Sequence, residues 1–143
     1  MADRISKERR SANMSKIRSA NTRPELKVRS VLHKLGYRFR LHRRDLPGKP
    51  DITLPRYCLV IFVNGCFWHR HSNCREASRP KTNSEYWEEK LNRNVARDVK
   101  NYSLLHSLGW TVVRLWECET ERMTENEIGK IVKKALTKRK TET

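Results

Sequence analysis

The chain has 143 residues, a length that suits one compact domain and is short for two. Lys and Arg number 32 against 16 Asp and Glu, and this formal net charge of +16 predicts a polyanionic partner. No segment approaches the roughly 20 consecutive apolar residues of a membrane helix, and no apolar signal segment follows the N-terminal charges. We therefore expect a soluble intracellular protein without a membrane partner.

The positive charge is concentrated near the N-terminus. Residues 1–50 carry a net charge of +11, whereas residues 51–143 carry +5. Because the first residues include few large apolar side chains, we expect residues 1–21 to form a basic arm that is helical in part. Residues 138–143 are expected to be a basic, frayed tail, which leaves residues 22–137 as the folded domain.

The segment from Thr22 onward predicts alternating helices and strands. Thr22 is a candidate N-cap, with Pro24 in the first turn and Glu25 at the third position, so a helix is expected to run from there to Gly36. The elements expected after it are strands over 37–41, 51–54 and 57–63, a long helix from residue 87 to Gly109, a strand over 111–116 and a helix over 126–136. This order predicts a mixed sheet in an α/β or α+β fold.

Three residues of the aperiodic loop over 66–82, together with a cysteine after the last predicted strand, are candidate zinc ligands. Cys66, His71 and Cys74 have the spacing C-x4-H-x2-C, and Cys118 follows the last predicted strand. Three thiolates and one imidazole are a typical ligand set for a structural zinc ion, which would brace the loop against a small core. The alternative is that these residues are ordinary buried thiols and a surface histidine.

A second candidate site lies where two predicted strands reach one edge of the sheet. Asp51 opens the strand that follows Pro50, and the next strand ends at Val63. The Asp51 carboxylate, the Val63 backbone carbonyl and, through water, Glu25 are oxygen ligands of the kind that Mg²⁺ prefers. The alternative is that Asp51 is a turn residue at the start of the strand.

His69 is the candidate general base, because a neutral imidazole can accept a proton from water near pH 7. The alternative is that His69, rather than His71, binds zinc.

Several large side chains are candidates for contact with nucleic-acid bases. Phe67 and Trp68 lie in the loop and Trp87 opens the long helix, so each ring could stack on a base or belong to the core. Met14 on the basic arm could enter a groove of the duplex or attach the arm to the domain.

Four motifs together carry a family resemblance. In chain order they are Pro47-Gly48-Lys49-Pro50-Asp51, the stretch VIFVNGCFWH from Val60 to His69, Tyr86-Trp87 with Lys90, Asn94, Arg97 and Asp98, and Gly109-Trp110 followed by Trp116-Glu117-Cys118. With these motifs the chain resembles the very short patch repair (Vsr) DNA mismatch endonucleases over residues 10–118.

The resemblance implies a fold, an activity and partners. The implied fold is an α/β restriction-endonuclease-like core, a mixed sheet flanked by helices with a structural zinc site. The implied activity is Mg²⁺-dependent nicking of one strand, 5′ to the thymine of a T:G mismatch that arises by deamination of 5-methylcytosine. It further implies a bacterial, cytoplasmic, nucleoid-associated monomer that binds double-stranded DNA, with a MutL-type mismatch repair protein as a second partner.

The resemblance also assigns roles to residues. The implied set is Glu25, Asp51, Asn64 and His69 for catalysis, Asp51 and the Val63 carbonyl for Mg²⁺, Cys66, His71, Cys74 and Cys118 for zinc, and Met14, Phe67, Trp68, Trp87, Lys90 and Asn94 for DNA. Asn64 lies where the family commonly has a second His, and Val63 lies where a Thr is frequent. Since Asn does not ionise near neutrality, we expect the His69 ionisation alone to govern the nicking rate.

Two other functions compete with this prediction. One is a zinc-stabilised DNA-binding module without catalysis, and the other is a sequence-specific nuclease that cuts both strands. Loss of nicking in an Asp51→Ala variant that still binds duplex DNA would distinguish the enzyme from the binding module. Double-strand cutting would require a dimer, because one chain of this size carries one active site.

Overall fold

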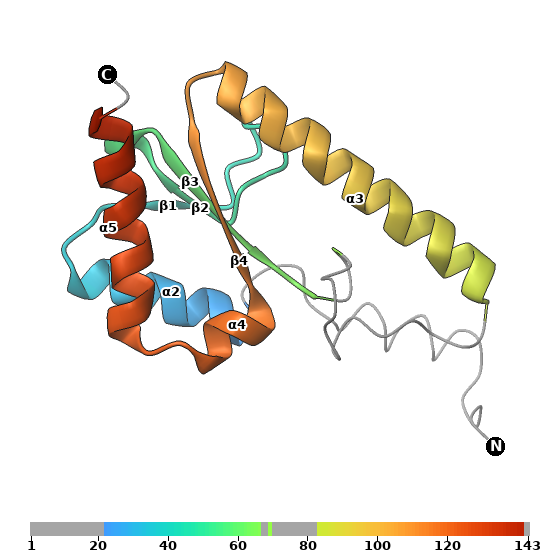
Figure 1. Cartoon of the computed structure of the whole chain (residues 1–143), viewed down its shortest axis with the longest axis horizontal. Helices are drawn as coiled ribbons and strands as arrows, with labels where there is room; N and C mark the ends of the chain where they lie inside the picture. The colour runs from blue at the N-terminus through green and yellow to red at the C-terminus, as the bar shows by residue number, and fades with distance from the viewer. Residues whose placement is uncertain (1–21, 67–68, 70–82, 142–143) are drawn as a thin grey trace.

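The structure is a computed structural model that describes residues 22–66, 69 and 83–141, with side chains up to Thr137 (Figure 1). Its elements are α2 (Arg23–Lys34), β1 (Arg40–Leu41), β2 (Ile52–Leu54), the short 3-10 helix η1 (Pro55–Tyr57), β3 (Leu59–Asn64), α3 (Ser84–Ser107), β4 (Thr111–Trp116), α4 (Glu117–Arg122) and α5 (Glu125–Thr141). The predicted alternation of helices and strands is confirmed.

The four strands form one mixed sheet in the order β1-β2-β3-β4. β1 pairs with β2 and β2 pairs with β3 in antiparallel fashion, with Ile52 opposite Ile61. β3 and β4 are parallel, with Val60 beside Val112 and Asn64 beside Trp116. The helix α3 makes the long connection that a parallel pair requires.

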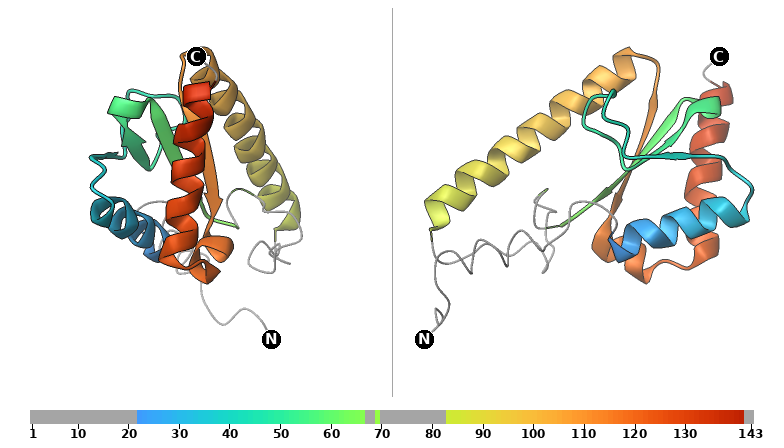
Figure 2. Two further views of the ribbon diagram at one scale, coloured as in Figure 1. Left: turned by 60° about the vertical axis from the view of Figure 1, so that its left-hand side comes forward. Right: turned by 180° about the vertical axis from the view of Figure 1, so that it is seen from behind.

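Helices cover the two faces of this sheet (Figures 1 and 2). α2 and α5 pack together on one face, and α3 lies across the other. The alternation of side chains along a strand explains why both faces of β3 are buried, since each face has a helical cover.

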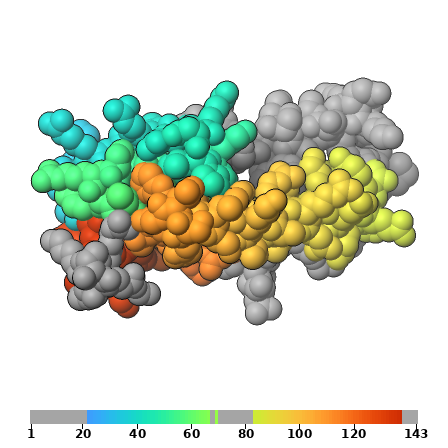
Figure 3. Space-filling model, turned by 90° about the horizontal axis from the view of Figure 1, so that it is seen from above, coloured from blue at the N-terminus to red at the C-terminus, as the bar shows by residue number. Residues whose placement is uncertain are grey.

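The main core lies between the sheet and the α2–α5 layer. Its buried residues are Val28, Val31, Leu32, Ile52, Leu54, Leu59, Ile61, Val63, Val113, Leu115, Ile128 and Val132. A smaller cluster of Val60, Phe62 and Leu105 lies under α3. The N-terminal half of α3 extends away from the sheet (Figures 1 and 3).

Local sequence signals explain the helix ends. The Thr22 hydroxyl accepts the Glu25 backbone N–H at 3.3 Å, as expected of an N-cap. α2 and α3 end before Gly36 and Gly109, which have φ angles of +82° and +90°. This left-handed conformation carries little steric cost for glycine, so both predicted stops are confirmed.

Several predicted boundaries differ from the structure. β3 begins at Leu59 rather than at residue 57, because Tyr57 lies in η1 and Cys58 has a φ of +48°. β1 is limited to Arg40–Leu41 because Tyr37 and Phe39 pack against the core without sheet pairing. α3 begins at Ser84, before the predicted start. Hydrophobic periodicity does not reveal this first turn, because its residues are mainly polar.

The remaining differences lie near the C-terminus. The sequence does not predict α4. Only Cys118 and Thr120 of this short helix are buried, so its sequence shows no repeating apolar pattern. α5 continues to Thr141, into the segment expected to be a frayed tail. Within the described residues, none of the helices combines the length and the hydropathy needed to cross a membrane.

Candidate active site

Asp51 lies at the edge of the sheet where β2 begins and β3 ends. Its carboxylate Oδ2 accepts the backbone N–H of Val63 at 2.8 Å, and only 8% of the residue is exposed. The turn before Asp51 packs against the sheet at Gly48, where an added Cβ would lie 3.2 Å from the Phe62 ring and 3.1 Å from Asn101. The glycine therefore permits the close approach that holds Asp51 at this edge.

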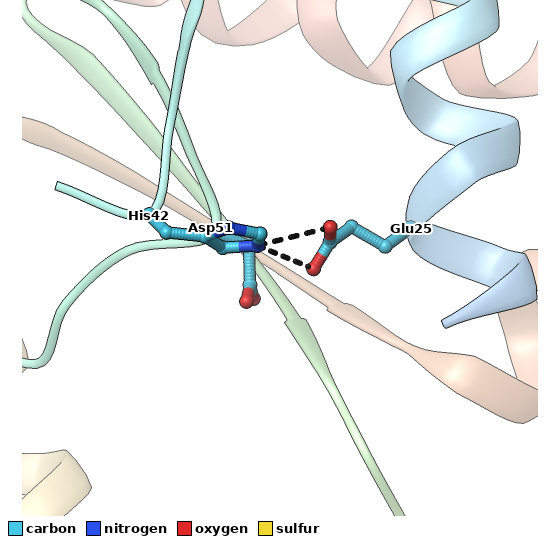
Figure 4. Close-up of side chains that lie close together, drawn as sticks. All are labelled: Glu25, His42 and Asp51. Carbon is cyan, nitrogen blue, oxygen red and sulfur yellow. Dashed lines mark hydrogen bonds and ion pairs between the residues drawn. The ribbon is translucent and has the colours of Figure 1, made fainter. Parts of the chain in front are cut away.

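Glu25 reaches the same edge from α2. Its side chain is buried, is ion-paired with Arg29, and lies 3.1 Å (Oε2) and 3.3 Å (Oε1) from Nε2 of His42. The potential ligand atoms of Glu25, His42 and Asp51 all lie within 4.8 Å of one another (Figure 4). The predicted approach of Glu25 to Asp51 is therefore present in the fold.

The electrostatics of this cluster favour a bound cation. Burial raises the pKa of Asp51 to about 8, against the opposing effect of the hydrogen bond from Val63. The negative charge of Glu25 raises the pKa of Asp51 further, whereas Arg29 lowers it. Two buried carboxylates this close are costly as a pair of anions, and a divalent cation between them would remove that cost.

The donor chemistry of the cluster therefore fits the implied Mg²⁺ ion. Asp51 and Glu25 supply oxygen ligands, and such an ion would polarise a phosphate and lower the pKa of a bound water. In the structure, the backbone N–H of Val63 donates a hydrogen bond to Asp51. A metal contact by the Val63 carbonyl remains a prediction.

His69 lies at the same end of the sheet as Asp51. Its backbone N–H donates to the Gly65 carbonyl at 3.1 Å, two residues beyond the amide that binds Asp51. Its Nδ1 contacts the Asp98 carboxylate of α3. If Nδ1 carries the proton that Asp98 accepts, Nε2 is unprotonated and available as a base.

Tyr102 connects the two halves of the site. Its hydroxyl accepts a hydrogen bond from Nδ2 of Asn64 at 2.9 Å. Burial is the main cause that raises the pKa of Tyr102, and the charges of Asp98 and Asp51 add to the rise. The charges of both carboxylates thus act on one phenol, to which Asn64 is hydrogen-bonded.

The candidate zinc ligands are described in part. Cys66 follows β3 and Cys118 follows β4, and both are buried. Because Asn64 pairs with Trp116, the two cysteines lie at equivalent positions just beyond adjacent parallel strands. This placement suits a shared ion, while His71 and Cys74 lie outside the described residues.

The candidate DNA contacts that the structure describes lie on α3. Lys90 is exposed, Trp87 and Asn94 are partly buried, and the Lys90 ammonium lies 5.5 Å from the Trp87 ring centroid. A shallow groove of about 310 Å³ follows this helix face and is lined by Tyr86, Glu89, Lys90, Arg93, Asn94 and Arg97. Met14, Phe67 and Trp68 lie outside the described residues.

Sequence reasoning missed four residues of the site: Arg29, His42, Asp98 and Tyr102. Asp98 lies inside a quoted motif, so its position gave a signal without indicating a role. Arg29 lies four residues after Glu25 on the same helix, a spacing that can indicate an ion pair. For His42 and Tyr102, which contact Glu25 and Asn64 from other elements, no local spacing pointed to the contact.

Comparison with known proteins identifies one family and several relatives of this chain. The family model described as DNA mismatch endonuclease Vsr matches residues 2–76. A type II nicking enzyme of Xanthomonas oryzae, V.XorIIP, is 54% identical over 119 residues, which cover 83% of this chain and 87% of the relative.

Two further relatives extend the comparison. The type II nicking enzyme V.NmeAIP of Neisseria meningitidis is 43% identical over 119 residues, covering 83% of this chain and 84% of the relative. The DNA mismatch endonuclease Vsr of Escherichia coli is 40% identical over 131 residues, covering 90% of this chain and 83% of the relative. The chain therefore belongs to the Vsr family of DNA mismatch endonucleases and is a nuclease.

Proposed function

We propose that the protein nicks one strand of duplex DNA on the 5′ side of the thymine in a T:G mismatch, with Mg²⁺ bound at Asp51. The observation that carries the proposal is the buried Asp51–Glu25 pair at the same sheet edge as the His69–Asp98 pair. A cation site beside a potential base is the arrangement that metal-assisted phosphodiester hydrolysis requires.

The assigned roles follow from the chemistry of each group. Asp51 and Glu25 would hold the cation, with the Val63 carbonyl as a further oxygen ligand. His69, oriented by Asp98, would accept a proton from the attacking water. Asn64 would hold a phosphate oxygen or a water through its amide while Tyr102 fixes its side chain.

The groove on α3 supports the choice of duplex DNA as substrate. Lys90, Arg93 and Arg97 provide cationic groups along one helix face, where phosphates bind. Asn94 can both donate and accept, as contact with a base edge requires. Phe67, Trp68 and Trp87 would insert on the major-groove side of the mismatch, and Met14 would enter the minor groove.

A T:G pair suits this mode of binding physically. The wobble pair stacks less firmly than a standard pair, so opening its step costs less, and the difference of a few kcal/mol discriminates against ordinary duplex. We propose zinc on Cys66, His71, Cys74 and Cys118 as the structural ion, and a MutL-type protein as a further partner.

A second candidate function is nicking at a fixed DNA sequence without a mismatch. It is favoured by the relatives that are named as type II nicking enzymes. It shares the active site described above and differs only in what the DNA-contacting residues recognise. A function without catalysis is disfavoured by membership of a nuclease family.

One assay tests the proposal. End-labelled duplexes carrying T:G or C:G at one position, within randomised flanks, are incubated with the protein and Mg²⁺, and the cut strand and position are mapped. We expect single-strand nicks immediately 5′ to the thymine in T:G duplexes only. Equal cutting of C:G duplexes at one flanking sequence would support the second candidate, and cuts in both strands would contradict both.

Asp51→Ala provides the control for catalysis. Because Asp51 holds the proposed cation and contacts no residue of the α3 groove, the variant should bind the T:G duplex within about threefold of the natural affinity. Its nicking rate should fall by at least about 1,000-fold. A variant that still nicks would exclude Asp51 as the metal ligand.

A further inference from the structure

We propose that His42 is a direct nitrogen ligand of the cation at Asp51 and Glu25, and that this ligand makes the site prefer Mn²⁺ over Mg²⁺. The inference rests on the proposed function, because it concerns the cation at the same carboxylates. It adds a residue, a ligand type and a metal preference that neither the motifs nor the predicted roles include.

The first argument is distance. Nε2 of His42 lies 3.1 Å from Oε2 of Glu25, and the ligand atoms of these two residues and Asp51 lie within 4.8 Å of one another (Figure 4). An octahedral ion with ligands at about 2.1 Å has adjacent ligands about 3 Å apart and opposite ligands about 4.2 Å apart. The separation of His42 and Glu25 therefore matches that of adjacent ligands, and the 4.8 Å bound on the whole set exceeds the opposite-ligand distance by only about 0.6 Å.

The second argument is the backbone of His42, which is independent of the side-chain distances. His42 has a φ of +48°, in the left-handed region that side-chain-bearing residues seldom adopt. Its backbone N–H donates to the carbonyl of Asp51 at 3.0 Å. The turn after β1 is thus held to Asp51 itself, and a sparsely populated conformation that brings a ring to a carboxylate pair is typical of a functional position.

Charge and access also suit a bound divalent ion. The side chain of His42 is 32% exposed, whereas that of Glu25 is 1% exposed, so the cluster opens to solvent on the His42 side. With Arg29 ion-paired to Glu25, the cluster carries one net negative charge when Asp51 is ionised, as it would be as a metal ligand, and His42 is neutral. A divalent cation is attracted to such a site.

The alternative is that His42 only orients Glu25 by hydrogen bonding. Arg29 already contacts Glu25, and its Nη2 also lies 3.4 Å from Nε2 of His42, so the carboxylate has a partner without the imidazole. The two alternatives differ chemically. An imidazole ligand favours Mn²⁺ relative to Mg²⁺, which prefers oxygen, whereas an orienting hydrogen bond confers no preference between the two ions.

The test is electron spin-echo spectroscopy of the full chain loaded with Mn²⁺, without DNA. Nitrogen of a coordinated imidazole gives a distinct modulation of the Mn²⁺ signal. We expect this modulation in the natural protein and its loss in His42→Gln, whose amide retains a hydrogen bond to Glu25. The matched control is His106→Gln, an exposed position on α3, which should keep the modulation.

A competition measurement gives the preference itself. Titration of Mn²⁺ against Mg²⁺ should show Mn²⁺ bound at least about tenfold more tightly by the natural protein, and this ratio should fall at least about fivefold in His42→Gln. An unchanged ratio, or a modulation that persists in His42→Gln, would overturn the assignment.

Two further variants keep the test decisive. His69→Gln and His71→Gln should each retain the modulation; its loss in either one assigns the nitrogen to that residue instead. If His42→Gln fails to fold, retention in these two variants, in His106→Gln and in His33→Gln, which covers the remaining histidine, supports His42, and loss in one of them refutes it.

Asp51→Asn separates this inference from the proposed function. If Asp51→Asn abolishes Mn²⁺ binding and the natural protein shows no nitrogen modulation, the cation site stands and the role of His42 is refuted. If Asp51→Asn leaves Mn²⁺ binding intact, the proposed cation site itself is refuted.

Discussion

On the α2–α5 face of the sheet the interior is apolar and continuous, whereas the α3 face combines a small apolar cluster with polar and charged groups. The first face holds Leu32, Ile61 and the other buried residues of the main core. The second holds Asn64 and Tyr102, and Asp98 reaches it from α3. The comparison indicates that most of the apolar burial that stabilises the fold lies in one layer, so the other layer can hold polar and charged side chains.

The proposed active site lies where the two layers meet. Glu25 comes from α2 in the stable layer, and Asp51 lies at the sheet edge between them. Glu25 can remain buried because Arg29 is ion-paired with its carboxylate and the main core fixes the surrounding helix. Four predictions test this division, in order of decreasing expected effect.

Replacement of Leu32 by Ala should cause the largest loss of stability. Leu32 is fully buried in the main core, so the cavity and the lost apolar contact should lower the free energy of unfolding by about 2–5 kcal/mol. The matched control is Leu26→Ala on the same helix, where 49% of the side chain is exposed and the change should be below about 1 kcal/mol. Denaturant unfolding monitored by circular dichroism measures both; equal losses would contradict the division.

Asp51→Asn should stabilise the metal-free protein at high pH. Because the pKa of Asp51 is raised to about 8 in the fold, the folded state holds a proton that the unfolded state has lost above about pH 4. This group's contribution therefore makes the natural protein less stable as pH rises from 5 to 8. The asparagine variant has no ionisable group at this position, so it does not lose this stability between pH 5 and 8.

The expected difference follows from linkage. About three pH units at 1.4 kcal/mol each give on the order of 4 kcal/mol of relative stabilisation of Asp51→Asn at pH 8 compared with pH 5. Unfolding curves at both pH values, without added divalent cations, measure it. A stability difference between the two proteins that does not vary with pH would show that Asp51 ionises normally.

Asp98→Asn should impair catalysis without affecting the fold. An amide cannot hold His69 in the tautomer that a carboxylate selects, so kcat for nicking should fall by about 100-fold or more. KM and the melting temperature should change little, because Asp98 is a positioning residue on the partly exposed α3 face. A parallel rise in KM would instead place Asp98 in DNA binding.

Tyr102→Phe should have the smallest effect. The variant loses the 2.9 Å hydrogen bond from Asn64 and keeps the ring packing on Phe62, where the centroids lie 5.1 Å apart. The free energy of unfolding should fall by about 0.5–1.5 kcal/mol, and the nicking rate should fall by less than about tenfold. A larger loss of nicking than that caused by Asp98→Asn would mean that Asn64, rather than His69, limits the reaction.

The sequence by itself determined most of the secondary structure and several members of the site. Thr22, Gly36 and Gly109 fix helix ends through local backbone chemistry, which acts over a few residues and can be read from order alone. The apolar run of β3 identified the central strand. The motifs around Asp51 and His69 indicated two of the candidate site residues.

Only the tertiary structure decided which other groups join these residues. His42 meets Glu25 across 17 positions, and Asp98 meets His69 across 29. Such contacts depend on strand register, on the path of α3 across the sheet and on the left-handed turn at His42. Hydrophobic periodicity specifies which face of an element is buried, but the convergence of charged side chains is fixed only when separate elements pack together.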